Sequence, residues 1–178
     1  AYVCYSDGTN SYEKRITIAT ETLGTERTIT SSGDNHPQLI TDSSGYLWRK
    51  GEAGPTTPQF YVQKSTNVND DSAWGTEYSF GSDASGYGHS MLIPVTGGNI
   101  VALYQDGNTI TYKKLSDPAI QGTANSVVTD CKNGVSANWS ISHYFSAVAD
   151  SSYKIHLIYV DSVTDDIEYT YYNGSVWS

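Results

Sequence analysis

The sequence has little positive charge and no long apolar run. Lys and Arg number 10 against 19 Asp and Glu, which gives the 178 residues a formal net charge of −9 at pH 7. Nucleic acids and anionic membranes bind to patches of Lys and Arg, so this charge argues against both as partners. No run of 18 apolar residues occurs. We therefore expect no transmembrane helix and no insertion into a membrane.

Sustained helical periodicity is also missing, and 16 Gly with many Ser and Thr favour turns over helices. Short runs instead alternate apolar and polar residues, which is typical of strands in sheets with two different faces. Four such runs are KRITIATE, QFYVQKST, NTITYKKL and DIEYTYYNG. The sequence therefore predicts an all-β chain.

A phrase led by histidine recurs every 53 or 54 residues. It reads HPQLITDSSGYLW from His36, HSMLIPVTGGNIV from His89 and HYFSAVADSSYKIH from His143. Each copy runs through an apolar stretch and a polar turn into a second apolar stretch. A repeat of about this length, built from short strands, is typical of the blades of a β-propeller.

We therefore predict a single partial β-propeller over residues 1–178, with approximate repeats 1–34, 35–87, 88–141 and 142–178. Each repeat should form a blade of four antiparallel strands. Second strands end in YSDG, WRKG, YQDG and YVDS, and Asp-Gly there indicates a tight hairpin. Innermost strands are expected near 37–42, 90–95 and 144–149.

The first repeat starts at its second strand, and the last ends as its fourth strand begins. The chain should thus form about four blades of a larger propeller with six to eight. The remaining blades, from a longer polypeptide or from another copy, should pack against both ends, because unpaired strand edges are normally covered. The residues expected to need such cover are Tyr2, Val3 and Tyr5 at the first end and Ile155, Leu157, Tyr169 and Tyr171 at the last.

The two cysteines, Cys4 and Cys131, lie two repeats apart. A disulfide requires Cα atoms within about 7 Å, so we expect two buried free thiols. The scarcity of Lys and Arg, the acidity and the abundance of Ser, Thr, Tyr and Asn resemble secreted or cell-surface proteins. Asn138 and Asn173 begin N-glycosylation sequons, although about two are expected by chance.

The segment YVCYSDG…KRITIATE…DNHPQLITDSSGYLWRK…FYVQKST resembles the bacterial neuraminidase repeat, or Asp-box, superfamily of sialidase-like propellers. STNVNDDSAW, ending at Trp74, and YYNGSVW, ending at Trp177, resemble Asp-boxes, although neither has the full Ser-x-Asp-x-Gly-x-Thr-Trp pattern. The resemblance implies a propeller fold with equivalent positions for the two tryptophans. It supports fold more than activity.

The resemblance also implies how sialidase chemistry would look: three arginines that hold the substrate carboxylate, a Tyr nucleophile beside a Glu, and an Asp. Arg15, Arg27 and Arg49 are the only arginines, and they fall on a third, a fourth and a second strand. They are better explained as solvated or locally paired, so sialidase activity is not expected.

Propeller polysaccharide lyases, also implied by the resemblance, use His and Tyr to remove a proton beside a uronate carboxylate. His36 with Tyr46, or His89 with Tyr87, are the catalytic candidates. The repeated histidines could also form a metal ring. The alternative, which we favour, is that a residue repeated in each blade is structural. We expect no metal site and no cofactor.

Carboxylates at Asp70–Asp71, Asp165–Asp166 and Glu52 are expected in loop tips as solvated charge, since none has the spacing of a calcium loop. Exposed aromatic rings can stack on sugars. Trp139, Tyr46 and Tyr87 are the candidates for ligand binding.

Clear repeats without a catalytic constellation favour an extracellular or cell-surface β-propeller. Such a protein would act as a glycan-binding, structural or interaction module, with a glycan or another protein as partner. The alternative is a carbohydrate-active enzyme, a polysaccharide lyase or glycosidase of the sialidase-like propeller class. Whether the chain is catalytic stays open at this point.

Overall fold

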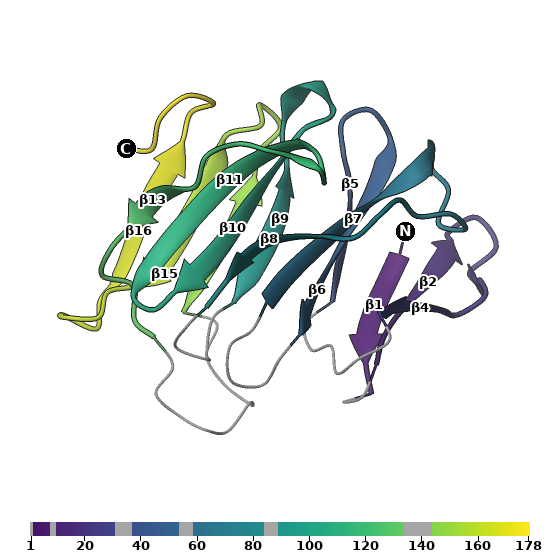
Figure 1. Cartoon of the computed structure of the whole chain (residues 1–178), viewed down its shortest axis with the longest axis horizontal. Helices are drawn as coiled ribbons and strands as arrows, with labels where there is room; N and C mark the ends of the chain where they lie inside the picture. The colour runs from purple at the N-terminus through teal and green to yellow at the C-terminus, as the bar shows by residue number, and fades with distance from the viewer. Residues whose placement is uncertain (1, 8–9, 31–36, 54–58, 84–88, 134–143) are drawn as a thin grey trace.

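The computed structural model describes residues 2–7, 10–30, 37–53, 59–83, 89–133 and 144–178. These residues form four antiparallel sheets that follow one another along an arc (Figure 1). Apart from a 3₁₀ turn at Thr96–Gly98, they contain no helix. Within these ranges, then, nothing helical is long and apolar enough to span a bilayer.

The strands of each sheet follow chain order, and the later strands of the first and third sheets share a partner. The first sheet contains β1 (Tyr2–Ser6), β2 (Ser11–Thr17), β3 (Thr22–Leu23) and β4 (Arg27–Thr30). The second contains β5 (Gln38–Thr41), β6 (Tyr46–Ala53), β7 (Gln59–Val68) and β8 (Tyr78–Ser82). The third contains β9 (Ser90–Pro94), β10 (Ile100–Asp106), β11 (Thr109–Asp117), β12 (Ile120–Gln121) and β13 (Asn125–Val128). The fourth contains β14 (Phe145–Ala149), β15 (Ile155–Val160) and β16 (Ile167–Tyr172).

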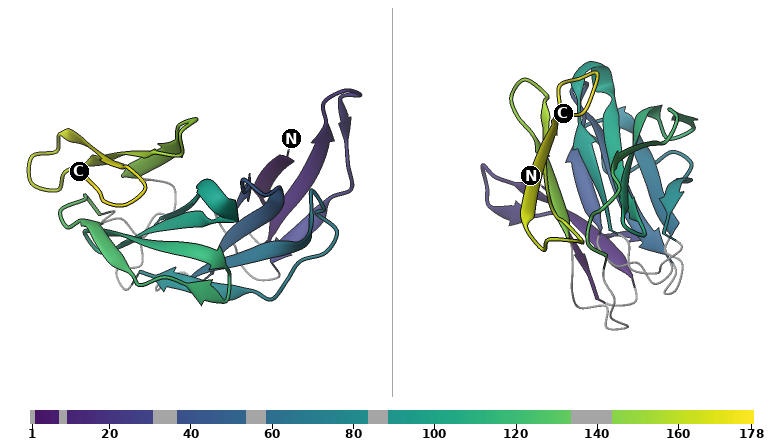
Figure 2. Two further views of the ribbon diagram at one scale, coloured as in Figure 1. Left: turned by 90° about the horizontal axis from the view of Figure 1, so that it is seen from above. Right: turned by 90° about the vertical axis from the view of Figure 1, so that its left-hand side faces the viewer.

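The innermost strands lie where the sequence predicts them, as β5, β9 and β14. Among the described residues, each is an edge strand that pairs with the strand after it and with no other. β9 contacts both β5 and β14, which brings the three strands together along the inner side of the arc (Figure 2). Consecutive sheets packed around a shared inner line are the architecture of a β-propeller. The predicted fold class is confirmed.

Two predicted turn features are also present. Gly107 has a φ of +59° and closes the hairpin after Asp106, as the Asp-Gly pair indicates. Trp74 forms an isolated bridge with β7, and Trp177 forms the corresponding bridge with β16. The two tryptophans therefore occupy equivalent positions in the second and fourth sheets, as predicted.

Two of the three junctions between sheets are apolar. Between the second and third sheets the core is aromatic: the ring centroids of Phe60 and Phe80 lie 5.9 Å apart, and Tyr104 packs against both. Between the third and fourth sheets it is mainly aliphatic, with Ile93, Val101, Leu103, Ile155 and Leu157 fully or almost fully buried.

The prediction that Ile155 and Leu157 lie on an uncovered face is wrong, because both pack against the third sheet. Side chains alternate along a strand, so the neighbouring residue Ile158 faces away from that sheet instead. Tyr169, which pairs with Ile158, is exposed as predicted. The prediction assigned the side chains of this strand to the wrong faces of the sheet, which is an error of one residue in register.

The junction between the first and second sheets is ionic. Arg49 on β6 reaches Glu13 on β2, with 3.5 Å between Nη1 and Oε1. Its Nε donates to Gln63 at 2.8 Å, and its guanidinium lies 4.1 Å from the centroid of the Trp74 ring. The Glu13 side chain is fully buried. Burial raises the pKa of Glu13 to about 7, although Arg49 acts in the opposite direction.

This raised pKa predicts that the protein loses stability as the pH rises. The folded state retains the Glu13 proton up to about pH 7, whereas an unfolded chain releases it near pH 4.5. The contribution of the Glu13 proton to the free energy of unfolding is therefore fully present below pH 4.5. It is lost as the pH rises through about 7, and the total loss is at most about 3 kcal/mol. Urea unfolding at pH 5 and pH 8 measures it. Glu13→Gln should reduce the difference between the two pH values, and an unchanged difference would contradict the assignment.

Candidate functional site

A cluster of charged and polar groups lies where the end of β6 meets the start of β9. Glu52 Oε1 accepts hydrogen bonds from Lys50 Nζ at 2.6 Å and from Ser90 Oγ at 2.8 Å, and from the Ser90 amide at 3.2 Å. Glu52 is buried, so the prediction of a solvated loop tip is wrong. WRKG does not end the strand, because β6 continues to Ala53.

His89 borders the same cluster. Its Nδ1 lies 3.8 Å from Glu52 Oε1, its ring packs 5.2 Å from Phe145, and its carbonyl accepts the Gln105 amide. Lys50 and Glu52 are both almost fully buried. These groups hold the second and third sheets together and neutralise one another, so the cluster contributes to the packing of the blades.

Most of the other predicted site residues lie outside the described part of the chain: His36, Tyr87, Asn138, Trp139 and His143. The His36–Tyr46 and His89–Tyr87 pairs therefore stay predictions. Asn173 is exposed, and its Oδ1 accepts the amides of Ser175 and Val176 within its own turn.

Several other chemistries find no support in the described part of the chain. Among the described residues, no group of three or more His, Cys, Asp or Glu side chains is placed so that it could hold a metal ion. Both thiols are free, and burial raises the pKa of Cys4 and of Cys131 to about 12, which removes the reactive thiolate. Arg49 is buried against Glu13, and Arg27 lies 3.9 Å from Asp71, so neither is an exposed clamp for a carboxylate.

Tyr46 lies at the opposite end of β6, beside a turn that Asp42 organises. Asp42 Oδ1 accepts the amides of Ser44 at 2.8 Å and of Tyr46 at 3.0 Å. Its Oδ2 accepts the indole N–H of Trp48 at 2.8 Å and lies 3.4 Å from Lys64 Nζ. The side chain is fully buried. One carboxylate thus fixes the turn, an indole and an ammonium group together.

Lys64 is held between two aromatic rings. Its Nζ lies 4.6 Å from the centroid of Tyr46 and 4.7 Å from that of Trp48. A cation near an aromatic face is stabilised by the ring quadrupole. With Asp42 as counter-ion, the charge of Lys64 is largely matched within the protein, and its side chain has little freedom to move.

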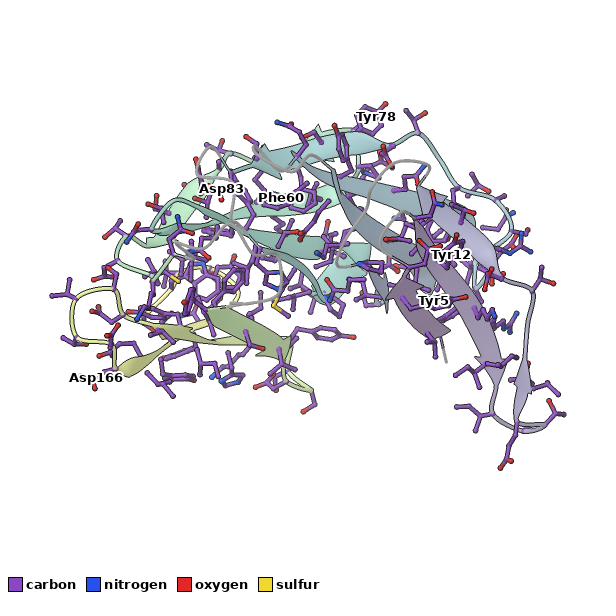
Figure 3. All side chains as sticks on the ribbon, turned by 90° about the horizontal axis from the view of Figure 1, so that it is seen from below. Tyr5, Tyr12, Phe60, Tyr78, Asp83 and Asp166 are labelled. Carbon is purple, nitrogen blue, oxygen red and sulfur yellow. The ribbon has the colours of Figure 1, made fainter. Side chains whose placement is uncertain are left out.

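Tyr46 and Lys64 belong to one wall of a cleft of about 510 Å³ between the second and third sheets. Its volume is in the range typical of small-molecule sites. The third sheet supplies the β11–β12 hairpin as the other wall. The lining combines aromatic rings, hydroxyls and one charge of each sign, from Tyr46, Lys64, Thr66, Thr76, Tyr78 and Asp117. Tyr78 is exposed, on the outer side of the arc (Figure 3).

A smaller cleft of about 170 Å³ occupies the next junction, between the third and fourth sheets. Lys114 lines it, and its carbonyl accepts the amide of Gly122 at 2.8 Å. In the first cleft the carbonyl of Lys64 accepts the amide of Gly75 at 2.9 Å. The two lysines therefore occupy equivalent strand positions, although the rest of the lining differs between the two clefts.

The fold and its clefts at successive junctions between blades define a β-propeller. Comparison of the sequence finds no match among known protein families or curated proteins. Solved structures do share the fold. A polysaccharide lyase of family PL25, an ulvan lyase bound to GlcA(1-4)Rha3S, matches with a TM-score of 0.59 and 9% identity over 99% of this chain and 54% of its own. A mutant lectin of Aleuria aurantia in complex with Fucα1-6GlcNAc matches with a TM-score of 0.56 and 14% identity over the same shares. This chain thus spans about half the length of either.

Proposed function

We propose that this protein is a glycan-binding β-propeller module and that the cleft at Tyr46, Lys64, Tyr78 and Asp117 holds the saccharide. The observation that carries the proposal is the chemistry of this cleft. Tyr78 offers an exposed ring on which the apolar face of a sugar can stack. Hydroxyls and a carboxylate beside it can bond to sugar hydroxyls, which both donate and accept hydrogen bonds.

The cleft favours a neutral saccharide over an acidic one. Lys64 is the cation in the lining, and Asp42 and two rings already match its charge. Asp117 adds a negative charge to the opposite wall. The net charge of −9 also disfavours association with a polyanionic chain. We therefore propose neutral sugars as the ligand class.

The comparisons are compatible with this proposal, since both solved structures contain a saccharide. At 9% and 14% identity they speak for the fold alone. A relationship to the sialidase-like repeats, and a secreted or cell-surface location, are part of the proposal and rest on the sequence. The module is proposed to act within a larger propeller, whose further blades pack against the first and fourth sheets.

The alternative prediction, a polysaccharide lyase or glycosidase, gains no specific support from the described residues. Glu52 and Lys50 are buried in a satisfied cluster with His89 at its border, and the cleft presents no base beside a free cation. Binding without turnover is therefore the proposed activity.

A pair of substitutions at one position tests the binding site. Tyr78→Ala should lower affinity for a bound neutral glycan about tenfold, the equivalent of 1.4 kcal/mol, because the stacking ring is lost. Tyr78→Phe keeps the ring and should retain most of the affinity. A glycan array identifies the ligand, and calorimetry then measures both variants.

Three results would argue against the proposal: an array without signal, equal binding by Tyr78→Ala and the wild type, or turnover of the bound glycan. Thermal melting should show similar stability for the two variants, since Tyr78 is exposed.

A further inference from the structure

The fourth sheet turns an apolar face to solvent. Val148 is 64% exposed, Ile158 49%, Ile167 76% and Tyr169 55%. These four residues, which we call the open face, come from all three strands of the sheet. So much exposed aliphatic and aromatic surface on one sheet usually marks an interaction site.

The open face corresponds to a face that is buried in the preceding sheet. In β10 and β11, Leu103 pairs with Tyr112, and Leu103 packs against the fourth sheet. In β15 and β16, Ile158 pairs with Tyr169 in the same arrangement. Leu103 is fully buried, whereas Ile158 is half exposed. The open face therefore has the form of a blade junction without the following blade.

The first sheet presents a second uncovered face at the other end of the arc. Glu13 points toward the second sheet and pairs with Cys4 on β1, so Val3 and Tyr5, on either side of Cys4, lie on the opposite face and are exposed. The Tyr5 and Tyr12 rings pack there, 5.3 Å apart. Figure 3 shows these tyrosines at one end of the molecule and Asp166, beside β16, at the other.

β1 also has an unused edge. It pairs with β2 on one side, and among the described residues no strand pairs with its other side. In the second sheet the corresponding strand β6 pairs on both sides, with β5 and β7. The first sheet thus offers an exposed face, with Val3 and two tyrosine rings beside the Lys14–Glu26 ion pair, and an open strand edge at the same end of the arc.

We propose that a second copy of this chain covers both ends, with the fourth sheet of each copy packed on the first sheet of the other. Two observations support this partner. The sheets form an arc with an exposed face that carries apolar side chains at either end (Figure 2). Both faces carry Val and Tyr side chains of the kind that fills the internal junctions.

The resulting assembly is a closed ring with a twofold axis. Two identical contacts form at once, which limits growth to a dimer. The ligand clefts lie at the internal junctions and not at these contacts, so the proposal does not depend on glycan binding.

Sedimentation of the purified 178-residue chain, from about 1 to 100 µM, tests the proposal. The wild type should sediment as a species with twice the chain mass of 19.4 kDa. Ile158→Lys places a charge in the open face and should weaken the dimer at least a hundredfold. Val163→Lys, at an exposed position in the β15–β16 turn, is the matched control and should leave the dimer intact.

A second variant tests the head-to-tail arrangement. Tyr5→Lys should also give monomers, because it alters the other half of the same contact. A mixture of Ile158→Lys with Tyr5→Lys should regain a dimer, since one of the two contacts then joins two unaltered faces. Circular dichroism should show that each variant is folded.

Several outcomes overturn the proposal. A wild-type monomer at 100 µM would assign the open face to further blades of a longer polypeptide instead. A dimer that Tyr5→Lys leaves intact would mean that two fourth sheets pack on each other. Species that grow with concentration beyond the dimer would show that the contact does not close.

Discussion

Arg49→Met is expected to lower the free energy of unfolding at pH 8 by about 3–5 kcal/mol, the usual cost of removing one partner of a buried ion pair. At this pH the unfolded chain carries an ionised Glu13, whose buried side chain faces Arg49 at 3.5 Å in the fold. The substitution also removes the hydrogen bond to Gln63 and the contact with the Trp74 ring. Methionine keeps most of the apolar stem, so the lost charge and its contacts dominate.

Urea unfolding provides the measurement, and two further variants make it specific. Adding Glu13→Gln to Arg49→Met should recover part of the loss, because the carboxylate that needed the cation is gone. Arg27→Met removes a more exposed arginine, 3.9 Å from Asp71, and should cost at most about 1 kcal/mol. Equal effects of Arg49→Met and Arg27→Met would mean that the buried pair does not hold the first two sheets together.

Asp42→Ala should be the most damaging single change in a turn, with a loss of about 3–4 kcal/mol. It leaves the Trp48 indole, two backbone amides and Lys64 without their common acceptor in a buried site. Each buried polar group left unsatisfied costs about 1–3 kcal/mol, and partial access of water to the amides reduces the sum.

The fourth sheet supplies the matched control for Asp42. Asp150 Oδ1 accepts the amides of Ser152 and Lys154 in the same pattern, and its Oδ2 contacts His156 where Asp42 bonds to Trp48. Asp150 is exposed, so water can replace it in Asp150→Ala and the loss should be much smaller. Thermal and urea unfolding of the two variants give the comparison. A loss at Asp150 as large as that at Asp42 would show that turn geometry, and not burial, sets the cost.

Much of the fold follows from the sequence because strand alternation and the spacing of the repeats are local signals. The hairpin after Asp106 and the bridge at Trp74 need only neighbouring residues. Glu52 escaped the same reasoning because Gly51 resembles the glycine of the Asp-Gly turns. Ala53, and not Lys50, occupies the position equivalent to Asp106, so β6 runs three residues further and carries Glu52 into the interior.

The candidate site could be predicted only in part. Tyr46 stands out in the sequence as an aromatic residue in a polar turn, and the structure places it in the cleft. Its partners Tyr78 and Asp117 are 32 and 71 residues away and come from two sheets. They meet because one blade stacks on the next, and the twist and spacing of that stack are not encoded in any single repeat.

The difference in chemistry between the three junctions has a consequence for how the chain reaches its fold. Blades of one kind have similar backbones, and a nascent chain of such repeats can pair sheets in the wrong order. The charge of Arg49 is compensated by Glu13 on the first sheet, so any other blade packed there would leave that charge buried and unpaired. The apolar surface around Phe60 disfavours a charged neighbour. The junctions therefore distinguish the proper neighbour of each blade from the others, and the ionic junction favours the correct order of assembly.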